Sequence, residues 1–475
     1  MLCSDRPHWL ARSLDAFGPL ITADSDLRAR YSADAWPLGI KRRRAGLGGV
    51  APAAVAYPRC TADVSRILAF AHDQRIPVTP WGAGSSVTGA PLPGPDALVM
   101  DLRGLNRILS IDETDGHVRA EAGLLGSTLE DHLAARNWST WFSPQSLQRS
   151  TVGGWVATRA TGQFSSRFGG IDDAVAAMTV VLADGTVASL GSPPRGALGP
   201  DLLSLFIGSE GALGVITEIV LRLHPRTPLY GIEAYQLDGV DRGLSALREV
   251  MQSGLRPAVL RLYDANEARH LGIAGPSADA VLLTAFAGHE EVAAAESAAV
   301  GAILGRAGAH ELGPGPTETW LQRRYDFSAV ERLLDTAGGY AETIEVAATW
   351  SKMPRVYRDM TSALSGVADK VLGHFSHAYT DGISLYLILL GQSADDERAV
   401  AALEAVWAAA KDTALQSGAV ISHHHGIGKA RLPYLATQLG TGEHVLRALK
   451  RALDPRCLLH PGSLIPAATN PDHEL

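Results

Sequence analysis

The chain has 475 residues, of which 46% are hydrophobic and 19% charged, which is typical of a folded globular protein long enough for two or three domains. Its formal charge of −8 argues against a nucleic-acid-binding protein, because neutralising a phosphate backbone requires a basic face. No apolar signal-peptide core follows Met1, and no stretch reaches the roughly 18 apolar residues of a transmembrane helix.

Cysteine usage bears on the compartment. Cys3, Cys60 and Cys457 are widely spaced and match no disulfide framework or metal-ligand pattern. A reducing compartment is therefore expected, and we predict a cytoplasmic protein. Peripheral attachment to a membrane and assembly into a homodimer stay open.

The first segments of the chain predict helices. Residues 4–35 have apolar side chains at helical spacing and predict one or two helices packed on the first domain. The basic run from Lys41 to Arg44 lies beside glycines, which favours a solvated loop over a recognition patch.

An α/β unit comes next. A short apolar run at 54–57 is followed by an amphipathic helix over 61–73, which begins with Thr61 or Asp63 as its cap. The β-biased segment 76–78 then leads into a glycine-rich stretch, as expected for strand, helix, strand and loop.

The glycine-rich stretch runs from Pro80 to Gly89. Its three glycines and two serines let the backbone turn tightly and aim several N–H groups at one point, as in an anion nest for phosphate. A plain turn between two strands is the alternative. The spacing around Gly82 is not G-x-G-x-x-G, so a Rossmann site is not predicted.

The rest of the first domain alternates strands with small-residue loops. A helix is expected at 127–136, and small-residue loops at 150–162 and 208–217 each lead into apolar sequence. Strands are expected at 97–102, 118–123, 177–182 and 216–223, with a hairpin signal at Asp184-Gly185. We interpret residues up to about 226 as one mixed α/β domain.

Beyond Pro225 strand patterns alternate with alanine-rich helices, which indicates an antiparallel sheet covered by helices. The strands are expected at 229–236, 258–263 and 280–286, and the helices at 240–252 and 290–307. A long helix at 397–415 precedes the apolar residues 419–421 and then three histidines, His423, His424 and His425.

The three small-residue loops and the run from Ser422 to Lys429 together resemble the vanillyl-alcohol oxidase or p-cresol methylhydroxylase superfamily. Within it the chain is most similar to alkylglycerone-phosphate synthases and D-2-hydroxyacid dehydrogenases, from about Tyr57 to the C-terminus. The resemblance implies a two-domain α/β plus α+β fold: a FAD-binding domain at 1–226 with an N-terminal helical extension, an antiparallel-sheet substrate domain at 227–415, and a segment at 416–475 that returns to the flavin domain.

The resemblance also implies a FAD site. Its residues in the first loop are Pro80, Trp81, Gly82, Ala83, Gly84, Ser85, Ser86 and Gly89. The others are Gln145, Ser146, Thr151, Gly153, Gly154, Thr158, Arg159, Ala160, Glu210, Gly211, Gly214, Val215 and Ile216. The first loop and the ring-side loop contain no histidine or cysteine for covalent attachment, so we expect non-covalent FAD.

The histidine triplet and Tyr386 are candidate catalytic residues. Adjacent side chains cannot all face one ligand, so a turn with stacked rings is the alternative for His423, His424 and His425. By resemblance the triplet lies at the flavin and the substrate, and Tyr386 matches a tyrosine that acts as acid or base in the synthases. That role is favoured if a neighbouring histidine lowers the tyrosine pKa, and cross-strand packing is the alternative.

Arg261 interrupts an apolar strand, so it is either an ion-pair partner or a clamp for an anionic substrate. The resemblance favours the clamp and adds His374, His377 and Arg332 as substrate-binding candidates. His374 or His377 matches one histidine of a metal site in the dehydrogenases. His424 replaces the glutamate of that site, so we predict no metal.

Two departures from the synthases indicate a different substrate. Phe142 stands where they have a catalytic histidine, and their second substrate arginine falls on Glu331, one residue from Arg332. We therefore predict a FAD-dependent oxidoreductase that oxidises a small anionic alcohol, such as a 2-hydroxy acid, by hydride transfer to flavin N5. Tyr386 or a triplet histidine would take the hydroxyl proton. The alternatives are an alkylglycerone-phosphate synthase, which uses a flavin N5 adduct without net redox, and a non-catalytic flavin-binding protein.

Overall fold

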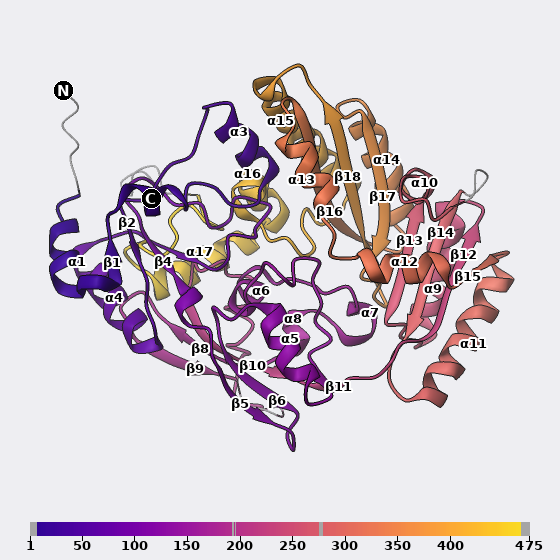
Figure 1. Cartoon of the computed structure of the whole chain (residues 1–475), viewed down its shortest axis with the longest axis horizontal. Coiled ribbons are helices and arrows are strands. Elements are labelled where there is room, and N and C mark those ends of the chain that lie inside the picture. The colour runs from indigo at the N-terminus through magenta and orange to yellow at the C-terminus, as the bar shows by residue number, and fades with distance from the viewer. Residues whose placement is uncertain (1–6, 192–193, 195, 275–278, 467–475) are drawn as a thin grey trace.

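The computed structural model describes residues 7–191, 194, 196–274 and 279–466, and in this part of the chain the strands form four sheets (Figure 1). The first sheet has the order β1-β2-β4-β3, built from Ile21–Thr22, Ala54–Ala56, Leu98–Asp101 and Val78–Trp81. Strands β2, β4 and β3 are parallel, and helix α4 (Thr61–Gln74) connects β2 to β3. The glycine-rich stretch therefore begins at the carboxyl end of a parallel strand.

The second sheet is antiparallel and five-stranded, with the order β5-β6-β10-β8-β9. Its strands are Ile108–Asp112, His117–Glu121, Val215–Arg222, Val175–Val181 and Val187–Leu190. Helices α5 (Gly126–Ala134) and α6 (Val152–Thr158) contribute Leu129, Trp155 and Val156 to its core. A two-stranded pair, β11 (His224–Pro225) with β7 (Trp138–Ser139), leads toward the next sheet.

The third large sheet is antiparallel and seven-stranded, with the order β15-β12-β14-β13-β17-β18-β16. Its strands are His310–Gly313, Tyr230–Leu237, Ala280–Phe286, Val259–Asp264, Lys370–Ser376, Gly382–Gln392 and Gly339–Thr349. Helices α9 (Val240–Gln252), α11 (Glu290–Arg306), α14 (Met353–Ser365) and α15 (Asp396–Ser417) pack on one face. The other face meets Trp141 and Phe164 of the first part of the chain.

Strand alternation decides which residues reach each face. In β13, Leu260 and Leu262 pack with the helices, whereas Val259 and Tyr263 pack with Trp141 and Phe164. Arg261 shares the second face, so it points toward the first part of the chain.

The last helices, α16 (Gly428–Leu439) and α17 (Gly442–Leu453), lie among the N-terminal elements, where yellow ribbon meets indigo and purple in Figure 1. After them the backbone of Val78 bonds to Leu458 and His460. The predicted fold class, α/β plus an antiparallel α+β unit, is confirmed. Within the described residues, no helix is both long and apolar enough to cross a membrane.

Two local predictions near the N-terminus are wrong. The cap of α4 is Cys60 without a side-chain bond, because the Asp63 carboxylate accepts the N–H of Arg59 instead. The basic run is not a solvated loop: it lies in helix α3 (Pro37–Arg44), and Lys41 is fully buried. Between α1 (Leu10–Phe17) and α2 (Ser25–Ala29), the predicted helical region also contains strand β1.

Candidate active site

The three small-residue loops of the first domain contact one another. A Cβ added to Gly82 would lie 2.7 Å from the hydroxyl oxygen of Thr151, and one added to Gly211 would lie 2.9 Å from the Pro80 ring. These approaches require glycine, because any side chain would separate the loops.

The first loop presents backbone donors. The N–H groups from Gly82 to Val87 donate no hydrogen bond to another group in the described part of the chain. Gly84 and Gly89 have φ of +70° and +72°, left-handed conformations that favour glycine and let the loop turn tightly. Since unpaired N–H groups need an acceptor, this loop fits the pyrophosphate of FAD.

The histidine triplet is anchored by one buried carboxylate. Glu345, on β16, accepts the N–H groups of His423 and His425, and it accepts a guanidinium hydrogen bond from Arg431 at 3.0 Å. Ser422 donates to the same carboxylate at 3.2 Å. Although burial opposes ionisation, the charge of Arg431 lowers the Glu345 pKa below its usual value. The triplet backbone is therefore fixed from the seven-stranded sheet.

The same loop is also fixed to the first domain. The carboxylate of Glu210 accepts the N–H of Ile427 at 2.5 Å and that of Gly428 at 3.1 Å. A Cβ on Gly428 would lie 2.3 Å from the Thr88 hydroxyl oxygen, and one on Gly426 would lie 2.5 Å from Glu210. The triplet therefore lies where the first loop, the third loop and the sheet meet.

A row of side chains crosses the seven-stranded sheet on the face that meets this loop. Tyr263 is paired with His374, His374 with Tyr386, and Tyr386 with Glu345 across β13, β17, β18 and β16. The His374 ring stacks on Tyr386 with centroids 4.9 Å apart. Tyr386 in turn stacks on His424 at 5.9 Å. The row thus connects Arg261 and its neighbours to the triplet.

Arg261 has no carboxylate partner among the described residues. Its Nη2 donates to Nε2 of His374 at 2.5 Å, and its Nε donates to the Tyr263 hydroxyl at 2.6 Å. The guanidinium also lies 5.5 Å from the centroid of the Trp320 ring. A half-buried guanidinium without a counter-charge is suited to bind an anion.

A buried glutamate holds His374 from the other side. Both oxygens of Glu267, on α10 (Ala265–His270), lie 2.9 Å from Nδ1 of His374. Because Arg261 donates to Nε2, His374 must carry its proton on Nδ1 and donate it to Glu267. Burial raises the Glu267 pKa to about 8, and the charge of Arg261 opposes that rise.

The histidines of the site are uncharged at neutral pH. Burial lowers the pKa of His374, His377 and His424 well below 6.5, and it lowers the pKa of His425 to about 4. Burial also lowers the His423 pKa, against the charge of Glu345. These imidazoles can therefore accept a proton or exchange tautomers without starting as cations.

The condition that favoured Tyr386 as a base is not met. Burial raises its pKa to about 12 rather than lowering it. The neighbouring imidazoles are neutral and do not stabilise a phenolate. Tyr386 therefore remains a phenol at neutral pH and is suited to donate a hydrogen bond, while an imidazole is better suited to accept a proton.

The structure brings most candidate residues together but not all of them. Arg261, His374, His377, Tyr386 and the triplet form one cluster. Arg332 does not join it, because it lies exposed on helix α13 (Ser328–Asp335). Gln145 is exposed, and the Arg159 side chain, 57% exposed, pairs with Asp172 at the surface. Phe142 packs on Trp155 in the core.

Sequence reasoning missed Glu267, Tyr379 and Glu345 as members of this cluster. The one local signal was Asp264-Ala265-Asn266-Glu267, a capping-box pattern, in which the Asp264 side chain accepts the N–H of Glu267 at 2.8 Å. That pattern predicts a helix start but says nothing of a contact with His374, which lies 107 positions away.

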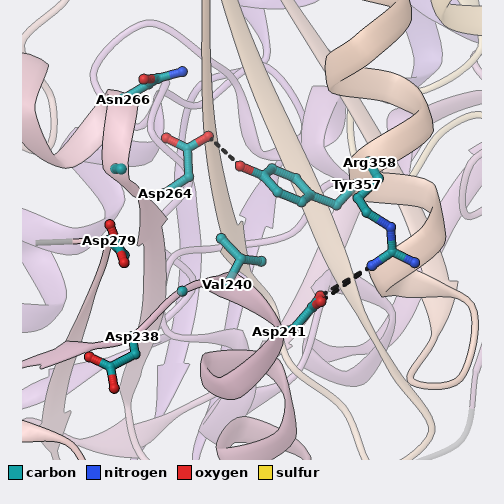
Figure 2. A pocket seen from close by; sticks show the side chains of 10 residues that line it. Asp238, Val240, Asp241, Asp264, Asn266, Asp279, Tyr357 and Arg358 are labelled. Carbon is teal, nitrogen blue, oxygen red and sulfur yellow. Dashed lines mark hydrogen bonds and ion pairs between the residues drawn. The ribbon is translucent and has the colours of Figure 1, made fainter.

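A cavity of about 380 Å³ lies on the opposite, helix-covered face of the sheet (Figure 2). Asp238, Asp241, Asp264 and Asp279 line it, and the Tyr357 hydroxyl donates to Asp264 at 3.0 Å. Of the residues that line it, only Asp264 also supports the cluster, because its side chain caps helix α10, which carries Glu267.

Two protein-family models match the chain, the FAD binding domain over residues 52–191 and the C-terminal domain of FAD linked oxidases over residues 233–464. The FAD-linked oxidoreductase YgcU of Escherichia coli K12 is 31% identical over 434 residues, covering 87% of this chain and 89% of that protein. Glycolate oxidase subunit GlcD of the same strain is 29% identical over 433 residues, covering 87% and 84%. Alkyldihydroxyacetonephosphate synthase of Dictyostelium discoideum is 26% identical over 460 residues, covering 90% and 75%.

Solved structures agree on the fold. A structure of alkyldihydroxyacetonephosphate synthase superposes with a TM-score of 0.78 at 24% identity, covering 95% of this chain and 84% of that one. Substrate-bound p-cresol methylhydroxylase gives a TM-score of 0.76 at 16% identity, covering 95% of both chains. The expected two-domain architecture is therefore confirmed, as is the expectation of a FAD-binding domain.

Proposed function

Because the chain belongs to the family of FAD-linked oxidases, we propose that it is an enzyme that oxidises a small anionic alcohol, such as a 2-hydroxy acid. The observation that supports this most is Arg261, a guanidinium without a carboxylate partner in the described chain, next to uncharged imidazoles. A fixed positive charge beside a proton acceptor suits a substrate with a carboxylate next to its hydroxyl.

FAD, when bound, supplies the acceptor for the hydride that leaves the alcohol carbon. The backbone N–H groups from Gly82 to Val87 would bind its pyrophosphate, and the loops around Thr151 and Gly211 would enclose the rest of the cofactor. No histidine or cysteine lies in the first loop or in the loop from Ser150 to Gly162, so we propose that the cofactor is not covalently attached.

We assign three side chains separate roles in binding and oxidising the substrate. Arg261 would hold the carboxylate, since its remaining N–H groups are free of protein acceptors in the described chain. The Tyr386 hydroxyl would donate a hydrogen bond, because its raised pKa keeps it protonated. His424 would take the hydroxyl proton at Nε2, which makes no hydrogen bond within the described residues.

The synthase alternative is less well supported by this cluster. Two positions that depart from the synthases have other structural roles here: Phe142 fills the core against Trp155, and Glu331 pairs with Arg149 at the surface. Neither supplies a group to the site.

The test is anaerobic titration of the FAD-loaded protein with short 2-hydroxy acids, followed by the flavin absorbance at about 450 nm. We expect bleaching by at least one acid, and we expect acid precipitation to release the colour into the supernatant. Consumption of acyl-dihydroxyacetone phosphate without bleaching would instead support a synthase. Spectral shifts without either reaction would support a non-catalytic flavin-binding protein.

A further inference from the structure

We propose that His424, His423 and Tyr379 form a proton path that leads from the substrate hydroxyl to the protein surface near Asp172. The path rests on the proposed function in one respect: oxidation of an alcohol releases a hydroxyl proton, and that proton must leave a buried site. His423 and Tyr379 are then proton-relay residues that do not touch the substrate.

The path is a continuous series of hydrogen bonds. Nδ1 of His424 lies 2.9 Å from Nδ1 of His423, and Nε2 of His423 lies 2.9 Å from the Tyr379 hydroxyl. Both ring nitrogens of His423 are therefore engaged. His377, whose Nδ1 contacts the Ser165 hydroxyl at 2.7 Å, stacks on the His423 ring at 5.2 Å and keeps it in place.

Neutral rings require one proton between the two Nδ1 atoms, so one imidazole donates and the other accepts. In the starting arrangement His424 donates from Nδ1 to His423, and His423 donates from Nε2 to Tyr379. Nε2 of His424 is then the acceptor that remains free to take the substrate proton. This arrangement satisfies every ring nitrogen of His423.

Proton transfer along the path balances. When His424 takes the substrate proton at Nε2, its Nδ1 proton passes to Nδ1 of His423. The Nε2 proton of His423 passes to the Tyr379 oxygen, and the former hydroxyl proton of Tyr379 leaves to water. Each ring ends uncharged in its other tautomer, so no imidazolium has to form beside His377, His425 and the guanidinium of Arg431.

The far end of the path lies at a half-buried phenol on the side of Asp172. Burial raises the Tyr379 pKa, and the negative charge of Asp172 adds to that rise. The same charge opposes the lowering of the His423 pKa by burial. The Asp172 side chain is 35% exposed and pairs with Arg159 at 2.9 Å. Water at this carboxylate can accept the released proton.

The loop that carries the histidine triplet is held in place by contacts that lie outside the proposed proton path. The triplet backbone is anchored through Glu345 and Arg431, and the following residues are anchored through Glu210. Removing the Tyr379 hydroxyl leaves all these bonds intact. A purely structural role for that hydroxyl therefore predicts little effect on rate.

The test compares Tyr379→Phe, in the loop between β17 and β18, with Tyr235→Phe, a control that removes a buried phenol from strand β12 of the seven-stranded sheet. In the FAD-loaded protein, single-turnover flavin reduction should slow by on the order of 10²-fold in Tyr379→Phe and hardly change in Tyr235→Phe. In ¹⁵N NMR of histidine-labelled protein, Tyr379→Phe should shift the ring nitrogen signals of both His423 and His424, because their tautomers are coupled.

Equal reduction rates in the two variants would overturn the path, as would unchanged His424 signals in Tyr379→Phe. If none of the alcohols tested reduces the flavin of the unmodified protein, the proposed function is contradicted. The NMR comparison then decides by itself whether the coupled imidazoles exist.

Discussion

At the scale of single residues, the placement of Arg261 depends on Glu267, which contacts His374 and does not contact Arg261 itself. Glu267 is 3% exposed and accepts the Nδ1 proton of His374, which leaves Nε2 as an acceptor for Arg261. If that acceptor were lost, His374 could present Nε2–H to the guanidinium, and two donors would face each other. Glu267 is therefore a positioning residue for the anion clamp.

Substitutions at Glu267 test this placement. Glu267→Gln keeps an oxygen that accepts from His374 and should stay near the wild-type KM, whereas Glu267→Ala should raise KM by on the order of 10-fold with a smaller change in kcat. In an Arg261→Lys background, Glu267→Ala should add little, since the two changes act on one contact. Equal and additive losses in both backgrounds would show that Glu267 only stabilises the fold.

The sequence could identify residues with unusual local context but not their partners. Arg261 was recognisable as a charge in an apolar strand, and the triplet by its adjacency to glycines. Glu267 and Tyr379 could not be found, because their contacts join positions 107 and 44 residues apart through the sheet register. The Tyr386 pKa depends on burial, which no local pattern shows.

At the scale of elements, helix α3 attaches the N-terminal segment to the seven-stranded sheet unit. The Lys41 ammonium is fully buried and donates to Asp396 of α15 and to the carbonyl oxygen of Thr336, both at 2.8 Å. Arg44 also donates to Asp396, and these partners lower the Asp396 pKa to about 2 despite the effect of burial. The link is thus present above about pH 4 and is lost as the pH falls toward 2.

Removing this link should destabilise the protein. Lys41→Met leaves a largely buried carboxylate with fewer partners and should cost about 3 kcal/mol in the free energy of unfolding, measured by urea denaturation. Arg42→Ala is a matched control on the same helix, since its pair with Glu404 is 41% and 49% exposed and should contribute less than about 1 kcal/mol. Equal effects of the two substitutions would contradict a structural role for Lys41.

Long periodic elements were predictable, whereas the role of α3 was not. Helices α9 and α15 and strands β12 to β14 lie close to their predicted ranges, because each has one apolar face at a clear period. The sequence does not show which of the four consecutive basic residues is buried, because that depends on how α3 packs on α15. Pro37 at the first turn was the available helix signal.

At the scale of the whole molecule, buried neutral histidines make the junction between the sheet and the loops sensitive to acid. Their folded-state pKa values lie below the ordinary value of 6.5, so the unfolded chain binds more protons below that pH. Stability should therefore fall as the pH drops from 6.5 toward 4. Buried carboxylates with a raised pKa, such as Glu267, Glu342 and Asp34, act in the opposite direction and offset part of this loss.

The thermal midpoint measured with saturating FAD should therefore decrease between pH 7 and pH 5. A group such as His425, whose pKa is lowered to about 4, contributes about 2 kcal/mol of this loss at pH 5. Release of FAD fluorescence should accompany the transition, because the same histidines join the loops to the sheet. A midpoint that is constant over this range would mean that the histidines already carry protons or are solvated.

The central claim is that Arg261 selects an anionic alcohol. The most direct measurement compares kcat/KM for a 2-hydroxy acid and its methyl ester in the wild-type protein and in Arg261→Met. The wild-type protein should prefer the acid by on the order of 10²-fold, and Arg261→Met should use both compounds about equally. A wild-type protein that oxidises acid and ester alike, or an Arg261→Met protein that retains the preference, would contradict this account.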